Sequence, residues 1–375
     1  MNRKAVCCFE ILAAVLVLAA SCSALADDSD ASIAAGGLVP RRETRIVMAK
    51  EVLRISDKKV VVDYDFRNDS DQDVTTEVAF PIPPYSNGFV EGPSPDEQSF
   101  QSFKLWVDGK PIHYESEAKA TLNDKDVTVV LKENKIDIPT FGHFEDKNDS
   151  KGYEVINTPD FSRLPKTARD RLTKAGIFKL YDQLPAGQWT VHLQYHWTQT
   201  FPAHSTVHIR HEYSPAVGFM QVDTTEVEDS LAQFKTGRSP NDDSGEVKWL
   251  AGFCADQPFL SVLERQLSQS KSQAKTEDER LWAGVAGSSW VDFILTSANT
   301  WQRPIEDFTL IIERGKPEQG EKRLISFCSP ENGKVERLDA DHFQVHLTNF
   351  VPTSELRIGF FDMPLPKPAQ PATAK

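Results

Sequence analysis

The chain has 375 residues, of which 39% are hydrophobic and 26% charged, and its formal net charge is −13. This length is enough to bury a sizeable core and to form two domains. An acidic surface repels nucleic acid and anionic lipid, so the net charge argues against both as partners.

The first 26 residues predict a secretory signal peptide. Arg3 and Lys4 give a positive start, residues 11–20 form a short apolar run, and small residues lead up to Ala26, the expected cleavage site. A membrane-spanning helix needs about 20 apolar residues, and this run is shorter. A lipoprotein signal at Cys22 is the minor alternative, because the usual leucine lies one place too early. The protein is therefore expected to be periplasmic or secreted.

Cysteine usage fits an exported chain. Cys7, Cys8 and Cys22 leave with the signal, and Cys254 and Cys328 remain. An even number of cysteines in an exported protein indicates a disulfide, so we predict that these two are paired. The closed loop of 74 residues (328 − 254) would contribute roughly 4 kcal/mol in the chain-entropy model.

The mature chain opens with a lead-in and then with strands. Residues 27–43 are small, acidic and glycine-containing, which predicts a mobile lead-in. From Thr44 onward, apolar residues recur with the period of two that is typical of half-buried strands. Residues 46–55 and 60–67 flank a polar turn and predict a hairpin. Residues 60–84 read as strand, turn and strand, so their Asn- and Asp-rich turn is expected to join a second hairpin.

A further hairpin is predicted around Asp108 and Gly109, which lie between the strand patterns at residues 100–107 and 112–117. Short strands joined by turns are typical of sandwiches, in which each sheet buries one face. We therefore expect a mainly β fold, consisting of one or more antiparallel β-sandwiches with two or three short helical insertions.

Several segments carry motifs of a known family. They are AFPIP at residues 79–83, FKLWVDGKPI at 103–112, WQRPIEDF at 301–308 and TNFVP at 348–352. Together they resemble a family of exported bacterial proteins described only as a domain of unknown function, over nearly all of the mature chain. The first two segments are also similar to the β-sandwich domain at the start of inter-alpha-trypsin-inhibitor heavy chains. Neither resemblance implies a catalytic residue.

Three helices are expected, each from a capping residue or an apolar stripe at helical spacing. They cover residues 127–134 after the cap Asp126, residues 160 or 162 to 174, and residues 259–274. The second is expected to end at Gly176. The third is expected to place Leu260, Leu263 and Leu267 on one side.

The most suggestive polar cluster lies in residues 192–212, which hold five of the nine histidines. Alternation places His192 and His196 on the outward face of one strand, and His208 and Glu212 on the outward face of the next. If a hairpin turns about Pro202, His196 lies opposite His208 and His192 opposite Glu212. Opposed Cβ atoms are about 5 Å apart, which suits shared ligation of Zn or Cu. An ordinary polar strand face explains the same pattern, and a slip of one residue in register would scatter the set.

Known enzyme signatures are otherwise absent from the sequence. It contains no Gly-x-Ser-x-Gly, no Gly-x-x-x-x-Gly-Lys, no Cys-x-x-Cys and no His-Glu-x-x-His. The glycine-rich residues 284–289 lack the lysine and the strand-to-helix setting of a phosphate loop, and we interpret them as a linker. A disulfide at Cys254 is favoured over its use as a thiol nucleophile.

Residues 266–279 are polar and repetitive and mark a candidate domain boundary. Residues 44–265 are expected to form an N-terminal β-sandwich domain that holds the helical insertions. Residues 280–363 are expected to form a C-terminal sandwich-like domain, and the alternative is that their strands complete the sheets of the first. Residues 364–375 are rich in Pro and Ala and predict an extended tail.

Two classes of function stay open. The first is an exported, non-catalytic binding or envelope-interaction module, whose partner is an unknown envelope protein or extracellular ligand. The second is a metal-binding protein or metal-dependent hydrolase that uses residues 192–211. A deep pocket lined by His196, His208 and acidic groups would favour the second class, and a flat or loop-built surface the first. The first class is preferred, because the sequence predicts β sheets with large loops and contains no catalytic signature.

Overall fold

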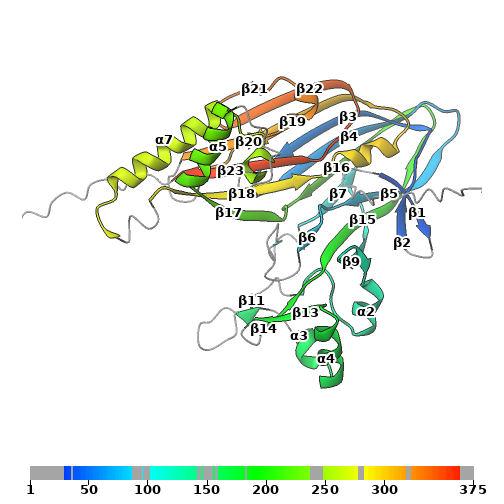
Figure 1. The fold of residues 1–375 in the computed structure, drawn as a ribbon. Coiled ribbons are helices and arrows are strands. Elements are labelled where there is room, and N and C mark those ends of the chain that lie inside the picture. Colours follow the sequence, from blue (N-terminus) through cyan, green and yellow to red (C-terminus); the bar gives the residue numbers. More distant parts are fainter. Residues whose placement is uncertain are drawn as a thin grey trace, which may run out of the picture.

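The structure is a computed structural model, and it describes residues 29–34, 37–86, 95, 102–141, 145–146, 155–156, 159–181, 184–236, 248–277, 283–317 and 322–363. The expected signal peptide with its cleavage site at Ala26, the alternative lipid site Cys22 and the tail 364–375 lie outside these residues. The described part is mainly β, with antiparallel sheets packed as a sandwich, which confirms the predicted fold class (Figure 1).

Sheet 1 has eight strands and is built from both ends of the chain. Its spatial order is β21 (Glu336–Arg337), β22 (His342–Phe350), β19 (Ile305–Glu313), β3 (Ile46–Ile55), β4 (Val60–Asn68), β16 (Ser205–Tyr213), β7 (Lys104–Val107) and β8 (Lys110–Pro111). β19 pairs with β3 in parallel, and β3 pairs with β4 as the predicted antiparallel hairpin. The C-terminal strands therefore complete a sheet that the N-terminal strands begin.

Sheet 2 has seven strands and lies across the core from sheet 1. Its order is β10 (Lys125–Asp126), β9 (Glu115–Leu122), β15 (Thr190–Phe201), β5 (Val74–Pro81), β1 (Ser29–Ala34) and β2 (Gly37–Pro40), with β6 (Tyr85–Ser86) also paired to β15. The lead-in that was predicted to be mobile thus supplies β1 and β2. Its backbone pairs along β5, whose unpaired edge would otherwise expose a row of N–H and C=O groups.

Sheet 3 has four strands and is the part of the fold that helices cover. Its order is β17 (Val217–Asp223), β18 (Val285–Phe293), β23 (Leu356–Met363) and β20 (Lys322–Phe327). One face contributes Phe293, Ile358 and Phe360 to the main core. The other face carries a second core with α5 (Thr224–Thr236), α6 (Lys248–Ala251) and α7 (Gln257–Gln273) (Figure 1). The glycine-rich stretch interpreted as a linker is the start of β18, so that interpretation is wrong.

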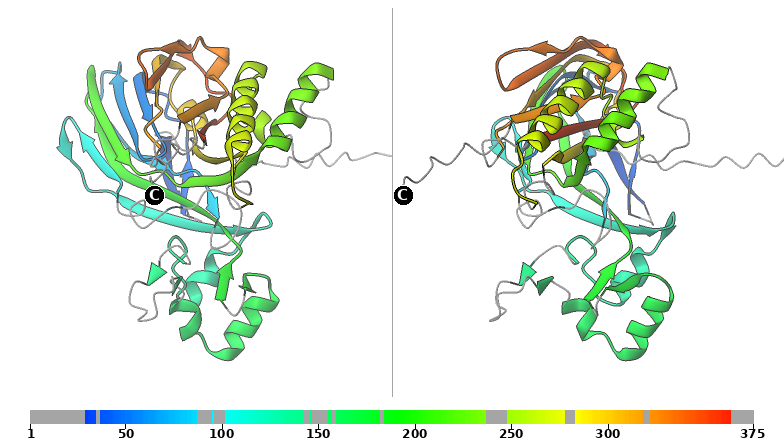
Figure 2. Two further views of the ribbon diagram at one scale, coloured as in Figure 1. Left: turned by 90° about the vertical axis from the view of Figure 1, so that its left-hand side faces the viewer. Right: turned by 60° about the vertical axis from the view of Figure 1, so that its left-hand side comes forward.

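A lobe projects from the sandwich on the side of β9 and β15 (Figures 1 and 2). It contains α2 (Thr128–Glu133), β11 (Glu145–Asp146), β12 (Val155–Ile156), α3 (Pro159–Arg163), α4 (Lys166–Lys174), β13 (Phe178–Tyr181) and β14 (Leu184–Gly187). Its small core packs Phe141, Phe161 and Phe178 with Trp189 at ring-centroid distances between 4.7 and 5.5 Å. The expected helix over residues 160–174 is divided, because α4 begins only after Pro165.

The other two expected helices are present, and the described structure contains two more. α2 and α7 form where they were expected, and α7 buries Leu260, Leu263 and Leu267. The helices α5 and α6 were not expected from the sequence. Among the described residues, no helix combines the length and the apolar character needed to cross a membrane.

Two connections predicted as hairpins are arches that pass from one sheet to the other. β4 lies in sheet 1 and β5 in sheet 2, and in the same way β15 lies in sheet 2 and β16 in sheet 1. The arches are bonded to each other: Asn68 Nδ2 donates to the carbonyl of Phe201 (2.9 Å), and the backbone N–H of Ala203 donates to Asp73 Oδ1 (2.9 Å). The Asp-rich turn therefore serves to join the two sheets.

Candidate functional site

The arch between β15 and β16 separates the four residues that the sequence grouped as metal ligands. Both strands turn their apolar series inward, so Trp197 of β15 faces His211 of β16 across the core, with ring centroids 5.3 Å apart. The outward residues of the two strands then point away from each other, on opposite surfaces of the sandwich. The predicted pairing of His196 with His208 is wrong: His196 lies opposite Ala79 and Glu115, and His208 opposite Asp65.

On the outer face of sheet 2, the two histidines have separate partners. His196 Nδ1 lies 2.6 Å from Glu77 Oε1, and His192 Nε2 lies 2.9 Å from the hydroxyl of Thr121. Thr198 donates to the second oxygen of Glu77 (2.9 Å). Burial lowers the pKa of His192 from its ordinary value, since the charged imidazolium loses hydration there.

On the outer face of sheet 1, the remaining two residues belong to a ladder of ion pairs. His208 Nδ1 lies 3.0 Å from Asp65, and Glu212 Oε1 lies 2.8 Å from Lys59 Nζ and 3.6 Å from Lys104 Nζ. The hydrogen bond from Lys59 lowers the pKa of the Glu212 carboxyl. Within the described ranges, no group of three or more His, Cys, Asp or Glu side chains is placed to hold a metal ion. The four residues are not brought together.

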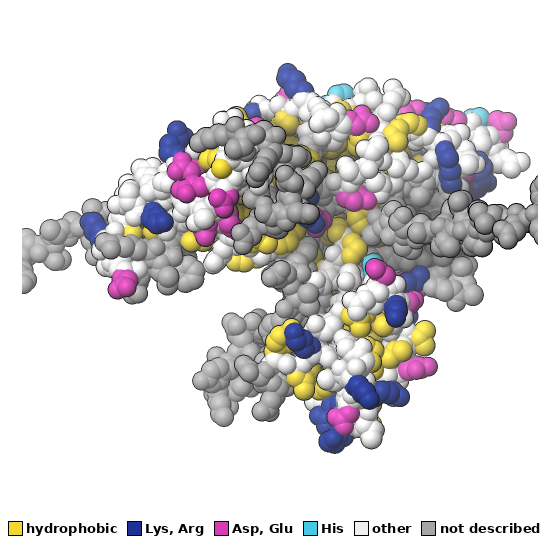
Figure 3. All heavy atoms as spheres, in the orientation of Figure 1, with side chains coloured by type: hydrophobic (Ala, Val, Ile, Leu, Met, Phe, Trp, Pro, Cys, Tyr) yellow, Lys and Arg dark blue, Asp and Glu magenta, His cyan; other side chains and the backbone are white. Residues whose placement is uncertain are grey.

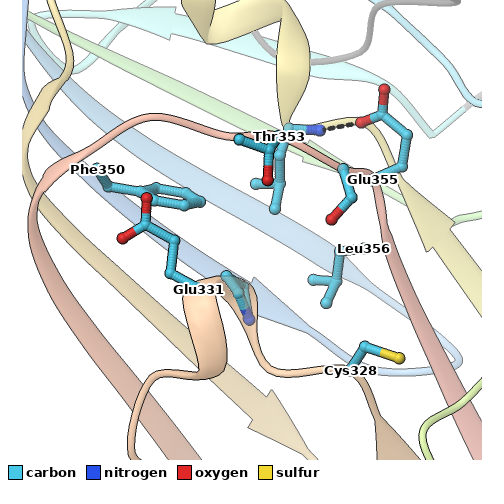
Figure 4. Close-up of a pocket in the computed structure, with 9 residues that line it drawn as sticks. Cys328, Glu331, Phe350, Thr353, Glu355 and Leu356 are labelled. Carbon is cyan, nitrogen blue, oxygen red and sulfur yellow. Dashed lines mark hydrogen bonds between the residues drawn. The ribbon is translucent and has the colours of Figure 1, made fainter.

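A pocket built by loops lies elsewhere, where sheets 1 and 3 meet (Figure 4). Its lining comes from the end of β18, the end of β20, the 3-10 helix η2 (Pro330–Asn332) and the loop from β22 to β23. The lining residues are Leu295, Cys328, Pro330, Glu331, Phe350, Thr353, Ser354, Glu355 and Leu356. Leu295, Phe350 and Leu356 are buried beneath the pocket, while Glu331, Thr353 and Ser354 are exposed, and the surface that the pocket presents is mainly polar.

Hydrogen bonds fix the walls of this pocket. Glu355 Oε2 accepts from the backbone N–H of Leu295 (2.7 Å) and of Thr296 (3.2 Å), so it caps the 3-10 helix η1 (Thr296–Thr300). From the same helix, Asn299 Nδ2 donates to the carbonyl of Pro352 (2.9 Å). Figure 4 shows Glu331, Thr353 and Glu355 arranged around Leu356. Because Glu355 is committed to the cap, Glu331 is the carboxylate that a ligand would meet.

Backbone strain gathers at the same place. Glu331 (φ 48°) and its neighbour Asn332 (φ 53°) are left-handed, as is Asn349 (φ 54°), which precedes Phe350. Cys254 (φ 51°) is left-handed too, and it forms the predicted disulfide with Cys328. A left-handed Glu or Cys is uncommon, and residues held in such conformations cluster at functional sites. Five other described non-glycine residues with positive φ lie elsewhere in the fold, namely Asp108, Asn123, Asp124, Lys135 and His204, so the left-handed conformation supports this site only together with the pocket itself.

A second pocket lies at the open end of the sandwich between sheets 1 and 2. Tyr85, Tyr195 and Tyr213 line it together with Ile82, Pro95, Leu193, Ser214 and Ala216. Burial raises the pKa of Tyr85 and of Tyr195, so both phenols stay protonated at neutral pH. Among the lining residues that the structure describes, no nucleophile lies beside a base, and the lining is mainly apolar.

Glu331, Thr353 and Ser354 were not among the candidate site residues that the sequence indicated. A signal was present, because the motif at residues 348–352 supplies Asn349, Phe350 and Pro352 to the pocket and its loop. The other family motifs have structural roles. Phe80 lies in the core, residues 107–110 turn between β7 and β8, and Trp301 packs on Phe66 with ring centroids 4.6 Å apart.

Comparison with known proteins agrees with the motif resemblance. A solved structure from Legionella pneumophila, described as "a putative nutrient binding protein", shares 13% sequence identity with the chain; the match covers 90% of this chain and 70% of that one, with a TM-score of 0.36. No curated protein matches. A family model described as "Domain of unknown function (DUF4424)" matches residues 26–358. The chain therefore belongs to the DUF4424 family.

Proposed function

We propose that this protein is an exported, non-catalytic binding module of the cell envelope, and that the pocket around Glu331 is its binding site. The observation that carries the proposal is the pocket itself, whose walls come from loops and whose backbone is strained at Glu331. Binding residues are often found on loops that a rigid scaffold positions. The partner would be an envelope protein or an extracellular ligand.

Export is supported by the predicted signal at residues 1–26 and by the disulfide. Cys254 and Cys328 are both exposed, and an exposed disulfide persists in oxidising compartments such as the periplasm. The same bond fastens the pocket wall at Cys328 to the turn between α6 and α7. The site would thus be assembled in the compartment where the bond forms.

The lining indicates the chemistry of the ligand. The pocket is shallow and has room for about one water-sized group, so it would receive one end of a ligand and would not enclose a whole small molecule. Thr353 and Ser354 provide hydroxyls, and Glu331 provides a negative charge. The ammonium group of a small amine or of a short peptide fits this combination.

Calorimetric titration with neutral and cationic amino acids and dipeptides tests the proposal. We expect a cationic probe to bind the mature protein, and Glu331→Gln to weaken that binding by about tenfold, as for a charge-assisted hydrogen bond. Glu336→Gln, at an exposed carboxylate outside the pocket, is the matched control. Absence of binding by every probe, or equal binding by the Glu331→Gln variant, would show that the pocket is not such a site.

A further inference from the structure

One segment of the projecting lobe, residues 159–181, has a net charge opposite in sign to that of the whole chain. Residues 159–181 contain six Lys and Arg and two Asp and Glu, a balance of +4, in a chain whose total is −13. Figure 3 shows Lys and Arg side chains gathered at the free end of the lobe. The net charge, from which the sequence argued against anionic lipid, describes the body of the molecule and not this surface.

The helix α4 presents its basic side chains outward on a fixed support. Leu172 is buried in the core of the lobe, and Lys166, Asp170 and Lys174 follow one another at intervals of four residues on the other side. Arg171 is exposed beside them. Asp170 is the one acidic residue of α4, and it pairs with Lys166 at 2.8 Å. Arg171 and Lys174 therefore dominate the charge of this face.

Exposed apolar side chains also lie on β13, the short strand next to α4, where Leu180 points to the opposite face from Lys179 and Tyr181. Leu180 is 49% exposed and Tyr181 is 38% exposed, directly after the exposed Lys179. Lys179 Nζ lies 4.8 Å from the centre of the Tyr181 ring. Aliphatic and aromatic groups next to Lys and Arg are typical of surfaces that settle at a membrane interface, where the apolar groups enter and the cations remain at the headgroups.

We infer that the surface of α4 and β13, formed by Arg171, Lys174, Lys179, Leu180 and Tyr181, docks the protein on a bilayer of anionic phospholipid. Charge complementarity selects this partner, since each Lys or Arg near an anionic membrane strengthens binding by roughly fivefold. The inference does not depend on the pocket at Glu331, which lies on a different part of the fold. Docking through the lobe would hold the acidic body away from the lipid surface.

Vesicle co-sedimentation of the mature protein tests the inference. We expect binding to vesicles of phosphatidylcholine mixed with phosphatidylglycerol, little binding to phosphatidylcholine alone, and loss of binding as salt is raised. The triple variant Arg171→Gln, Lys174→Gln, Lys179→Gln should bind the mixed vesicles about a hundredfold more weakly. Leu180→Ser should weaken binding without changing its salt dependence.

The control removes three positive charges from exposed positions on the body, as Lys58→Gln, Lys110→Gln, Lys322→Gln. It should bind the mixed vesicles as the parent protein does. Circular dichroism would check that both triple variants are folded. We expect that they are, because all six substituted side chains are exposed. Three outcomes overturn the inference: no binding to mixed vesicles at low salt, equal binding to both lipids, or a loss of binding in the control variant that matches the lobe variant.

Discussion

The indole of Trp290 lies directly on the backbone of Gly218, and this contact fixes what position 218 can hold. A Cβ added at Gly218 would lie 2.1 Å from Trp290 Cε2, well inside any contact distance. We expect Gly218→Ala to lower the free energy of unfolding by roughly 1–3 kcal/mol, because the indole must shift in a packed layer between sheet 3 and its helices. Urea titration followed by tryptophan fluorescence measures the change.

The matched control is Gly287→Ala on the neighbouring strand. Its added Cβ would meet only Phe219, at 3.9 Å, which is ordinary contact. An alanine in a strand also loses less conformational entropy on folding than a glycine, so this variant should be neutral or more stable. Equal destabilisation by both substitutions would mean that the contact with Trp290 is not the cause.

A second prediction at the scale of single residues concerns pH. His192 has a lowered pKa in the folded state, so the unfolded chain takes up a proton first as pH falls below about 6.5. The contribution of His192 to stability is complete above that pH and declines from there down to its folded pKa. We expect His192→Gln to reduce the stability lost between about pH 7.5 and pH 5.5, measured by urea unfolding at each pH.

His342 provides a comparison of opposite sign. Its hydrogen bond with Asp339 raises its pKa, so its contribution is complete below the unfolded pKa and is lost as pH rises through the folded pKa. His342→Gln should therefore enlarge the stability lost on acidification, where His192→Gln reduces it. If both variants changed the stability lost on acidification in the same direction, the opposite pKa shifts of His192 and His342 would be contradicted.

At the scale of elements, a buried ion-pair cluster joins sheet 1 to sheet 3. Arg323 of β20 is 8% exposed, and its guanidinium reaches Asp57 in the turn between β3 and β4 (2.8 Å) and Asp362 of β23 (2.7 Å). Removal of the cation leaves the Asp57 carboxylate buried without its partner. We expect Arg323→Met to cost about 3–5 kcal/mol in urea unfolding.

Arg357→Met is the control for that measurement. Arg357 pairs with Asp292 at 2.6 Å but is 49% exposed, so solvent screens the pair and the cost should stay below about 1 kcal/mol. A result in which the two substitutions cost the same would show that the cluster around Arg323 adds nothing beyond a surface pair.

The alternation of apolar and polar residues predicted where the strands lie better than it predicted which strands pair. It placed Trp197 and Ile209 inward and His192 and His208 outward, as the structure has them. The same alternation is compatible with a hairpin and with an arch, because each connection only has to reverse the chain. What selects the arch is the cross-bonding of Asn68 to Phe201, a contact over 133 residues that no local pattern contains.

The pocket around Glu331 could not be predicted from the sequence, for a related reason. Its floor and rim come from segments near residues 295, 330 and 353, which are brought together only by the packing of sheets 1 and 3. Local composition could show that residues 330–333 form a turn, but not what the turn faces. The disulfide was predictable, because in an exported chain with two cysteines the pairing has a single solution.

At the scale of the whole molecule, the parallel pairing of β19 with β3 decides how the chain unfolds. Sheet 1 takes its central strands from both sides of the candidate boundary at residues 266–279, and the main core does so too, since Tyr64 and Leu310 both belong to it. We therefore expect one cooperative transition in urea, with circular dichroism and tryptophan fluorescence coinciding.

A fragment of residues 27–277 tests this coupling most directly, because it ends shortly after α7 and therefore keeps that helix. It would lack β18, β20 and β23 under the helices, and β3 would lose β19 along one edge. The apolar face of α7 and the unpaired backbone edge of β3 would then be open to water, so the fragment should lack a cooperative transition and associate on size-exclusion chromatography. A monomeric fragment that unfolds cooperatively on its own would instead establish residues 44–265 as the independent domain that the sequence suggested.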